Sequence, residues 1–308
     1  MARSLFSRLI SPFRRKAPKD GGGRRARRRA GASEEMHAQA RDLARLIARY
    51  LQEGEAKGRG NSRREAIRAA KAEARRAARS FSVVSFPKSG RTWLRVMLDD
   101  LKLNANYTHD GSGHSMVGHV EELQPASEAF AGKTVVFLYR DPRDTVVSGY
   151  FQASKRVNTY AGTLSNFVRD PRHGIEKIVR FNMEWLERGP TLCKFLPVTY
   201  EELRVDTAGT LARIVAFVGA ERDAEAIRAT VEEASFEKMK EKEANGELAE
   251  RYGKALLPAD NADPNSYKVR EGVIGGFRKH LGDDDIAYCD EVLQRLGYPL
   301  DRHGAPSD

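Results

Sequence analysis

Residues 81–93 decide the fold, and they read Phe81-Ser-Val-Val-Ser-Phe-Pro87-Lys88-Ser89-Gly90-Arg91-Thr92-Trp93. The first six residues form a short run rich in β-branched and aromatic side chains, which favours a buried strand. A proline, a lysine, a serine and a glycine then form a turn, and an apolar helical pattern follows. A strand that turns sharply into a helix directs backbone N–H groups and the positive helix end outward. Such an arrangement binds anions, usually phosphate or sulfate.

A second segment supports this interpretation. The P-loop motif of nucleoside triphosphatases, G-x-x-x-x-G-K-[ST], is absent from the first segment, and a Lys-Ser-Gly turn alone also suits an ordinary helix start. Residues 133–139, however, read Lys-Thr-Val-Val-Phe-Leu-Tyr, which predicts another buried strand. Arg140 follows this strand directly, and Ser148 stands eight residues after Arg140.

Together the two segments resemble the cytosolic and bacterial sulfotransferases that use 3′-phosphoadenosine 5′-phosphosulfate (PAPS). In that family the motif Pro-Lys-Ser-Gly-x-Thr-Trp holds the 5′-phosphosulfate. The resemblance assigns this role to residues of the first turn, with the backbone amides of residues 89–92 at the 5′-phosphate and Trp93 against the adenine: Lys88, Ser89, Gly90, Arg91, Thr92 and Trp93. It also implies that Arg140 and Ser148 bind the 3′-phosphate, the group that separates this donor from ATP. From the residues alone, Arg140 could instead pair with Asp141 or Asp144.

A third match lies near the C-terminus, where residues 270–278 read Arg-Glu-Gly-Val-Ile-Gly-Gly-Phe-Arg. This segment is similar to the family's loop Arg-Lys-Gly-x-x-Gly-Asp-Trp-Lys, which closes over the nucleotide. Arg270 and Gly272 are kept at positions that the resemblance places at the 3′-phosphate. Three positions depart from the pattern: Glu271, Gly276 and Phe277.

Two weaker matches lie between these motifs. Residues 196–203 resemble the strand that carries Tyr-Glu-Asp in the family, which implies a cofactor contact for Tyr200. Ser235-Phe236 resembles the segment beside the adenine, so Phe236 is expected to stack there. The matches occur in the family's order over residues 81–300.

The resemblance also implies the catalytic groups. Lys88 is expected to stabilise the charge on the leaving phosphate, and a histidine after the strand between the two main motifs is expected to act as general base. His109, which follows Asn-Tyr-Thr, is the favoured candidate. His119, 21 residues before Arg140, is a rival, and three further side chains stay open: His114, Glu121 and Glu122. No metal is predicted.

Composition bounds the partners. The chain has 308 residues and a formal charge of +10, and residues 1–30 alone carry eleven Lys and Arg against Asp20. The basic character therefore belongs to a tail and not to the catalytic body. The tail predicts no specific nucleic-acid partner, although peripheral membrane contact through residues 1–30 stays open. Two cysteines without metal-ligand spacing and no apolar run of membrane-spanning length indicate a cytoplasmic protein, with the inner face of the membrane as an alternative.

The pattern of elements predicts the fold class. Strands at 81–86, 134–139 and 194–199 alternate with helices at 91–102, 143–152, 175–188, 207–218, 223–234 and 284–296. Such alternation is typical of α/β proteins, here a P-loop-like three-layer αβα arrangement with a central parallel sheet. We expect a basic disordered tail (1–32), an N-terminal helical extension (33–80), the sulfotransferase domain (81–300) and a C-terminal tail (301–308).

The predicted function is therefore in-line transfer of a sulfuryl group from PAPS, as co-substrate, to a hydroxyl or amine acceptor. The acceptor is a small molecule, a carbohydrate or a lipid, and its pocket is expected in the loops 104–130, 152–174 and 240–268. Two alternatives are a P-loop-like nucleotide kinase and a non-catalytic protein that binds polyanions through its arginine-rich tail. The sequence does not decide the oligomeric state.

Overall fold

The structure of the protein is a computed structural model, which describes residues 81–109, 119–123, 130–253, 256–260, 262–270 and 272–299. The predicted tail (1–32), helical extension (33–80) and C-terminal tail (301–308) lie outside these residues. The described residues thus belong to the predicted sulfotransferase domain.

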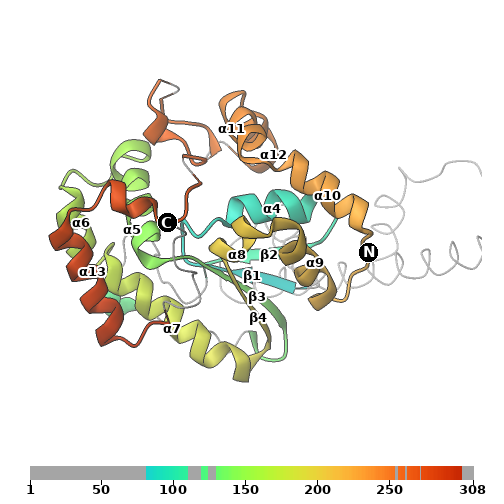
Figure 1. The fold of residues 1–308 in the computed structure, drawn as a ribbon, viewed down its shortest axis with the longest axis horizontal. Coiled ribbons are helices and arrows are strands. Elements are labelled where there is room, and N and C mark those ends of the chain that lie inside the picture. The colour runs from blue at the N-terminus through green and yellow to red at the C-terminus, as the bar shows by residue number, and fades with distance from the viewer. Residues whose placement is uncertain are drawn as a thin grey trace, which may run out of the picture. The chain divides into compact units, whose positions relative to one another are not determined.

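A parallel sheet forms the centre of the fold (Figure 1). Its strands are β1 (Phe81–Val84), β2 (Ala105–Thr108), β3 (Thr134–Tyr139) and β4 (Lys194–Thr199), in the spatial order β2-β1-β3-β4. Each neighbouring pair is parallel, with Ser82 opposite both Asn106 and Val135. The three predicted strands are confirmed, although β1 ends two residues earlier than expected. β2 was not among them, because only its first residue is buried.

Helices follow β1, β3 and β4 along the chain. Among the described residues the α-helices are α4 (Arg91–Asp100), α5 (Pro142–Phe151), α6 (Leu164–Arg169), α7 (Ile175–Leu192), α8 (Tyr200–Val205), α9 (Thr207–Phe217), α10 (Ala224–Glu233), α11 (Phe236–Ala244), α12 (Glu247–Tyr252) and α13 (Asp283–Arg295). Shorter turns are the 3₁₀ segments η2 (Val120–Glu122), η6 (Pro264–Ser266) and η7 (Gly276–Lys279) and the π-helical segment η4 (Gln152–Arg156). The six predicted helices are present, and the sequence did not predict α6, α8, α11 and α12.

The start of α8 differs from the expected geometry at Tyr200. The resemblance placed Tyr200 on a strand, whereas β4 ends at Thr199 and Tyr200 is the first helical residue. Thr199 and Glu202 form a capping box in which the hydroxyl accepts from the Glu202 amide and the carboxylate accepts from the Thr199 amide. This reciprocal pair stabilises a helix start at this point.

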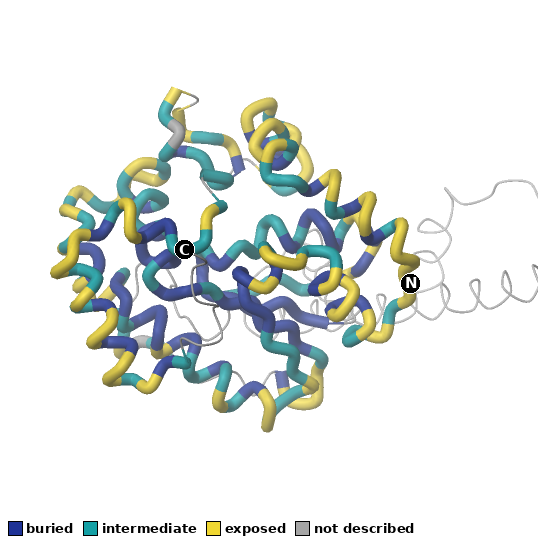
Figure 2. Tube along the Cα trace, in the orientation of Figure 1, coloured by how far each residue is buried: buried dark blue, intermediate teal, exposed yellow. Residues whose placement is uncertain are grey.

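The sheet is covered on both faces, which gives three layers. Along β3, Val135, Phe137 and Tyr139 pack in one apolar cluster with residues of α5, α6, α7 and α13. The alternate residues Val136 and Leu138 pack in a second cluster with α4, α9, α10 and α11. Figure 2 shows the strands as the buried centre between these helical layers. Because both faces are buried, the strand reads as a continuous apolar run. The predicted αβα fold is confirmed.

The carboxyl ends of all four strands lie at one edge of the sheet. Each strand is followed by a residue with functional chemistry: β1 leads to Lys88, β2 to His109, β3 to Arg140 and β4 to Tyr200. Ligands of open α/β sheets bind at this edge, where neighbouring crossovers run in opposite directions. The chain order β1-β2 on one side and β1-β3-β4 on the other places such a point between the ends of β1 and β3.

Candidate active site

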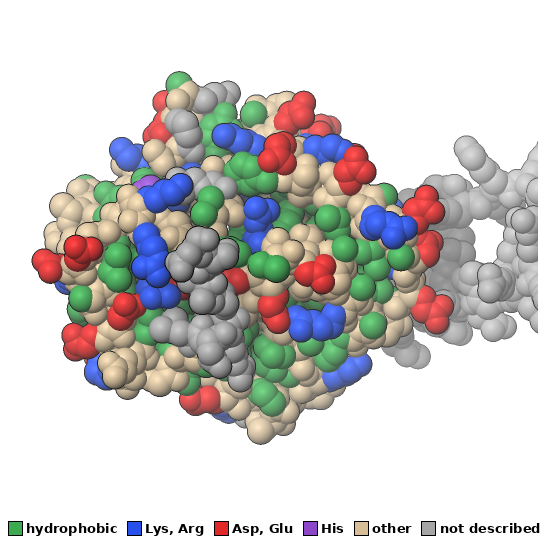
Figure 3. All heavy atoms as spheres, viewed as in Figure 1, with side chains coloured by type: hydrophobic (Ala, Val, Ile, Leu, Met, Phe, Trp, Pro, Cys, Tyr) green, Lys and Arg blue, Asp and Glu red, His purple; other side chains and the backbone are tan. Residues whose placement is uncertain are grey.

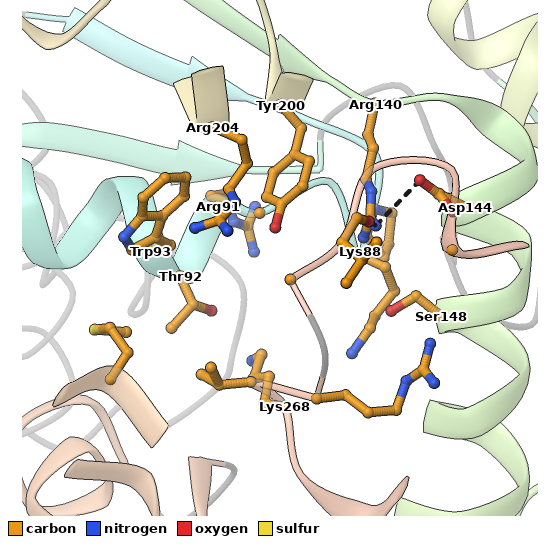
Figure 4. Close-up of a pocket in the computed structure, with 18 of the residues that line it drawn as sticks. Lys88, Arg91, Thr92, Trp93, Arg140, Asp144, Ser148, Tyr200, Arg204 and Lys268 are labelled. Carbon is orange, nitrogen blue, oxygen red and sulfur yellow. Dashed lines mark hydrogen bonds and ion pairs between the residues drawn. The ribbon is translucent and has the colours of Figure 1, made fainter. Parts of the chain in front are cut away.

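A cavity of about 320 Å³ opens at this edge of the sheet (Figure 4). Its volume is within the range of small-molecule sites. Twelve of the predicted site residues line it: Lys88, Gly90, Arg91, Thr92, Trp93, His109, Arg140, Ser148, Tyr200, Phe236, Arg270 and Gly272. Ser89 is buried behind the surface of the cavity, and its hydroxyl has no hydrogen-bond partner among the described residues. In the space-filling view, Lys and Arg side chains gather around a hollow in the visible face (Figure 3).

The turn after β1 has a strained backbone. Lys88 has a φ of 75°, in the left-handed region that non-glycine residues rarely adopt, and Gly90 follows with a φ of 90°. A Cβ atom at Gly90 would lie 2.5 Å from Cδ2 of Tyr200, so only glycine allows this close approach. Strain of this kind concentrates at functional sites. Gly90 is also the N-cap of α4, and it has no side chain that could cover the first amides of that helix.

Lys88 lies in this turn and lines the cavity. Its Nζ donates to Oε1 of Gln152 at 3.2 Å, and no carboxylate of the described residues forms an ion pair with it. Burial, together with the positive charges of Lys268 and Arg156, lowers the pKa of Lys88 to about 7. An anionic ligand would reverse this shift, because a nearby negative charge favours the ammonium form.

Arg140 lines the cavity and is held by an ion pair with Asp144 (Figure 4). Its Nη2 lies 3.3 Å from Oδ2 of Asp144 and donates to the carbonyl oxygen of Val273 at 3.0 Å, while its Nε is buried without a partner. Asp144 also accepts from the backbone amides of Gly275 and Phe277, at 2.9 and 2.8 Å. One carboxylate thus attaches both Arg140 and the C-terminal loop to α5.

The C-terminal loop contributes Arg270 and Gly272. Arg270 contacts Nε2 of His280 at 3.1 Å and stacks on the ring of Phe151, with 4.3 Å from Cζ to the centroid. Gly272 has a φ of 66°, and a Cβ atom there would lie 2.8 Å from Cδ2 of Phe236. The loop therefore packs its backbone directly on Phe236.

Trp93 and Phe236 lie on neighbouring segments at the cavity wall. The indole Nε1 of Trp93 donates to the carbonyl oxygen of Ala234 at 2.7 Å, two residues before Phe236. Tyr200 makes an edge-on contact with Trp93, with 6.1 Å between the ring centroids. Arg204 stacks on the indole at 5.5 Å. These contacts build an aromatic wall beside the cationic turn.

His109 is the one candidate base of the described residues that lines the cavity. Because the Ser85 carbonyl can only accept, Nδ1 donates to it at 2.6 Å; because an arginine can only donate, Nε2 accepts from Nη2 of Arg91 at 2.7 Å. Burial and the charge of Arg91 lower the pKa of His109 to about 4. The imidazole is therefore neutral at pH 7, with its lone pair at Nε2.

The other candidate bases are placed differently. His119 caps η2 by accepting from the Glu121 amide at 3.3 Å, and the Glu121 side chain is 86% exposed. Neither residue lines the cavity. His114 and the Glu122 side chain lie outside the described part of the chain.

The sequence did not predict several residues that line the cavity: Asp144, Gln152, Arg204, Met239, Lys268, Val269, Val273 and Gly276. Asp144 was named only as an alternative partner of Arg140, and its contacts with the loop 131 and 133 residues later have no local signal. Lys268 fell inside a loop assigned to acceptor binding. A lysine two residues before the Arg270 motif was the one signal that could have identified it.

The arrangement as a whole suits a ligand with two separated anionic groups and an aromatic base. One anion would face Lys88 and the amides of the turn, and the other would face Arg140 and Arg270. The unpartnered Ser89 hydroxyl and Arg140 Nε are polar atoms that such a ligand can satisfy. Across the described residues, no group of three His, Cys, Asp or Glu side chains could hold a metal ion. In the same part of the chain, no helix has the length and apolar character to cross a membrane.

The chain is similar to known proteins in sequence and in fold. A sequence model described as Sulfotransferase domain matches residues 122–300. Human sulfotransferase 2A1 is 24% identical over 266 residues, which cover 73% of this chain and 86% of the relative. Sulfotransferase 2B1 of Rattus norvegicus is 30% identical over 235 residues, which cover 72% of this chain and 64% of the relative.

Two solved structures share the fold. Mouse sulfotransferase SULT7A1, complexed with PAP, is 21% identical with a TM-score of 0.53, over 72% of this chain and 85% of that one. Retinol dehydratase, in complex with androsterone and the inactive cofactor PAP, is 17% identical with the same TM-score, over 71% of this chain and 80% of that one.

Proposed function

Because the chain belongs to the sulfotransferase family, we propose that its cavity binds PAPS beside an acceptor and that Lys88 and His109 assist the transfer of the sulfuryl group. Family membership confirms the predicted enzyme class, a PAPS-dependent sulfotransferase. The roles of individual residues, the nature of the acceptor, the cytoplasmic location and membrane contact through residues 1–30 stay proposals.

One observation carries the proposal for the donor site. Three segments that are far apart in the sequence converge on one cavity: the turn at Lys88, the strand end at Arg140 and the loop at Arg270. These are the segments whose motifs the family uses for the two ends of PAPS. Lys88 and the amides of residues 89–92 would hold the 5′-phosphosulfate. Ser148 would join Arg140 and Arg270 at the 3′-phosphate, and the aromatic wall of Trp93 and Phe236 would hold the adenine.

The transfer itself asks little covalent chemistry of the protein. The acceptor oxygen attacks sulfur, the bond between sulfur and the bridging oxygen of the phosphate breaks, and that oxygen keeps the electron pair. Lys88 would stabilise the charge that forms on the phosphate. The acceptor hydroxyl loses its proton in this step. Nε2 of His109 would receive this proton once its hydrogen bond from the Arg91 guanidinium is broken.

The acceptor is proposed to be a small molecule with a hydroxyl group. The guinea-pig relative named 3-beta-hydroxysteroid sulfotransferase, 29% identical over 183 residues, acts on acceptors of that kind by its name. The cavity wall of this chain is more cationic than a steroid requires.

Titration of the purified protein with PAP (3′,5′-adenosine bisphosphate), ATP and AMP tests the donor site. We expect PAP to bind far more tightly than ATP, without a requirement for Mg²⁺. Arg140→Ala should weaken PAP by about 10- to 100-fold, because a charged hydrogen bond of this kind contributes about 1.5–3 kcal/mol. Arg228→Ala, on the exposed side of α10, serves as the control and should bind like the wild type. Equal affinity for ATP, or Mg²⁺-dependent binding, would favour the kinase alternative and overturn the proposal.

A further inference from the structure

Apart from Arg204, which stacks on Trp93, the cations of the cavity divide into two groups. Lys88, Arg140 and Arg270 occupy positions that the motifs assign to the phosphates of the donor. Arg91 and Lys268 also line the cavity, yet no motif assigns their side chains to a phosphate. Both lie close enough to His109 for their positive charges to act on its imidazole. The second group therefore faces the place where the acceptor hydroxyl must lie.

Arg91 is incompletely satisfied. Its Nη2 contacts His109, but its Nη1 is buried and has no hydrogen-bond partner in the described part of the chain. A buried guanidinium N–H without a partner is unfavourable, so it is a group that a bound water, ion or substrate can satisfy. A guanidinium also binds a carboxylate through two parallel hydrogen bonds, which an imidazole nitrogen cannot offer.

Lys268 is held in place by its backbone. Its amide donates to Oε1 of Glu243 at 2.6 Å, and the Val269 amide donates to Oε2 at 2.8 Å. The buried carboxylate of Glu243 is neutralised by Nη1 of Arg156 at 3.0 Å. The Lys268 ammonium forms no ion pair with a described carboxylate, and burial with the charge of Arg156 lowers its pKa to about 8. The protein thus positions this lysine in the cavity without a counter-ion among the described residues.

We propose that the acceptor carries an oxyanion, such as a carboxylate, beside its hydroxyl group, and that Arg91 and Lys268 bind this anion while the hydroxyl faces His109. The inference rests on the proposed function, since it assumes the donor on the other side of Lys88. It also explains how the base becomes available. When Arg91 turns to the carboxylate, Nε2 of His109 loses its hydrogen-bond donor and can accept the hydroxyl proton.

Isosteric pairs of acceptors test this proposal. The full-length protein, saturated with PAP, is titrated by calorimetry with 3-hydroxybenzoate and 3-hydroxybenzamide, and with methyl glucuronide and methyl glucuronamide. In each pair the shape is nearly the same and only one member is charged. Transfer from labelled PAPS is measured with the same four compounds. We expect the carboxylate to be preferred by about tenfold or more in at least one pair, in binding and in kcat/KM.

Three variants give the charge dependence. Arg91→Gln and Lys268→Gln should each remove most of the preference for the carboxylate and leave the affinity for PAP within about twofold. Arg91→Gln keeps the backbone amide of the turn. The control Lys240→Gln removes an exposed lysine of α11 and should keep the preference.

The results separate this inference from the proposed function. Failure of PAP to bind would overturn the proposed function. The inference alone is overturned if PAP binds but the amide and carboxylate acceptors bind with equal affinity. It is also overturned if PAP binds and neither carboxylate does. If the variants weaken PAPS but not PAP, and slow neutral and acidic acceptors equally, Arg91 and Lys268 hold the sulfuryl group, which also overturns it.

Discussion

The pKa of Lys88 makes the affinity for PAP depend on pH above 7. In the free protein, burial and the charge of Lys268 hold that pKa near 7. A phosphate beside the ammonium raises it again, so the bound protein keeps its proton at pH values where the free protein has lost it. Binding therefore takes up a proton, and the affinity for PAP must fall as the pH rises through and above 7.

The magnitude follows from this linkage. If only the protonated lysine binds PAP tightly, the dissociation constant rises about fivefold between pH 7 and pH 8 and about 50-fold between pH 7 and pH 9. Below pH 7 the phosphates of PAP begin to gain protons, so the range from pH 7 to pH 8 isolates Lys88 best.

Calorimetric titration of PAP at pH 7, 7.5, 8, 8.5 and 9 measures this slope. Repeating the titration at pH 8 in two buffers of different ionisation enthalpy should show uptake of nearly one proton per PAP. Lys88→Arg keeps its charge throughout and should flatten the slope between pH 7 and pH 8. A dissociation constant that stays level from pH 7 to pH 9 in the wild type would refute the reasoning.

Three further predictions concern the loop and the base. Glu243→Gln removes the negative charge that holds the backbone amides of residues 268 and 269. The affinity for PAP should therefore fall about tenfold, and these two amides should exchange hydrogen faster. The exposed control Glu241→Gln should change neither quantity. Gly272→Ala places a Cβ atom 2.8 Å from Phe236 and requires a φ of 66° of an alanine. The affinity for PAP, measured by titration, should therefore fall. An unchanged affinity would mean that the loop does not contact the donor. His109→Ala should lower kcat with labelled PAPS by about 10²- to 10⁴-fold and leave PAP affinity unchanged, and full activity would assign the base to another residue.

The parts of the site that the sequence predicted are those with local geometry. The turn at Lys88 and the strand end at Arg140 are each specified within about ten consecutive residues, because strand, turn and helix signals are all short-range. The parallel sheet followed from the alternation of such segments. β2 was harder, since its four residues carry little apolar pattern.

Contacts between distant segments could not be predicted in this way. Asp144 meets the amides of a loop more than 130 residues away, and Glu243 neutralises Arg156 from another element. The contact of the Arg91 side chain could not be predicted either, although Arg91 belongs to the turn at Lys88. Its position is the variable one, so the sequence assigned only its backbone to the anion, and the contact with His109 depends on how β2 pairs with β1.

A crystal structure of the full-length protein with PAP tests the central claim most directly, namely that three distant motifs form one PAPS site. We expect the 5′-phosphate at the turn of Lys88, the 3′-phosphate at Arg140, Ser148 and Arg270, and the adenine against Trp93 and Phe236. PAP bound elsewhere, or bound with its 3′-phosphate away from Arg140 and Arg270, would contradict it.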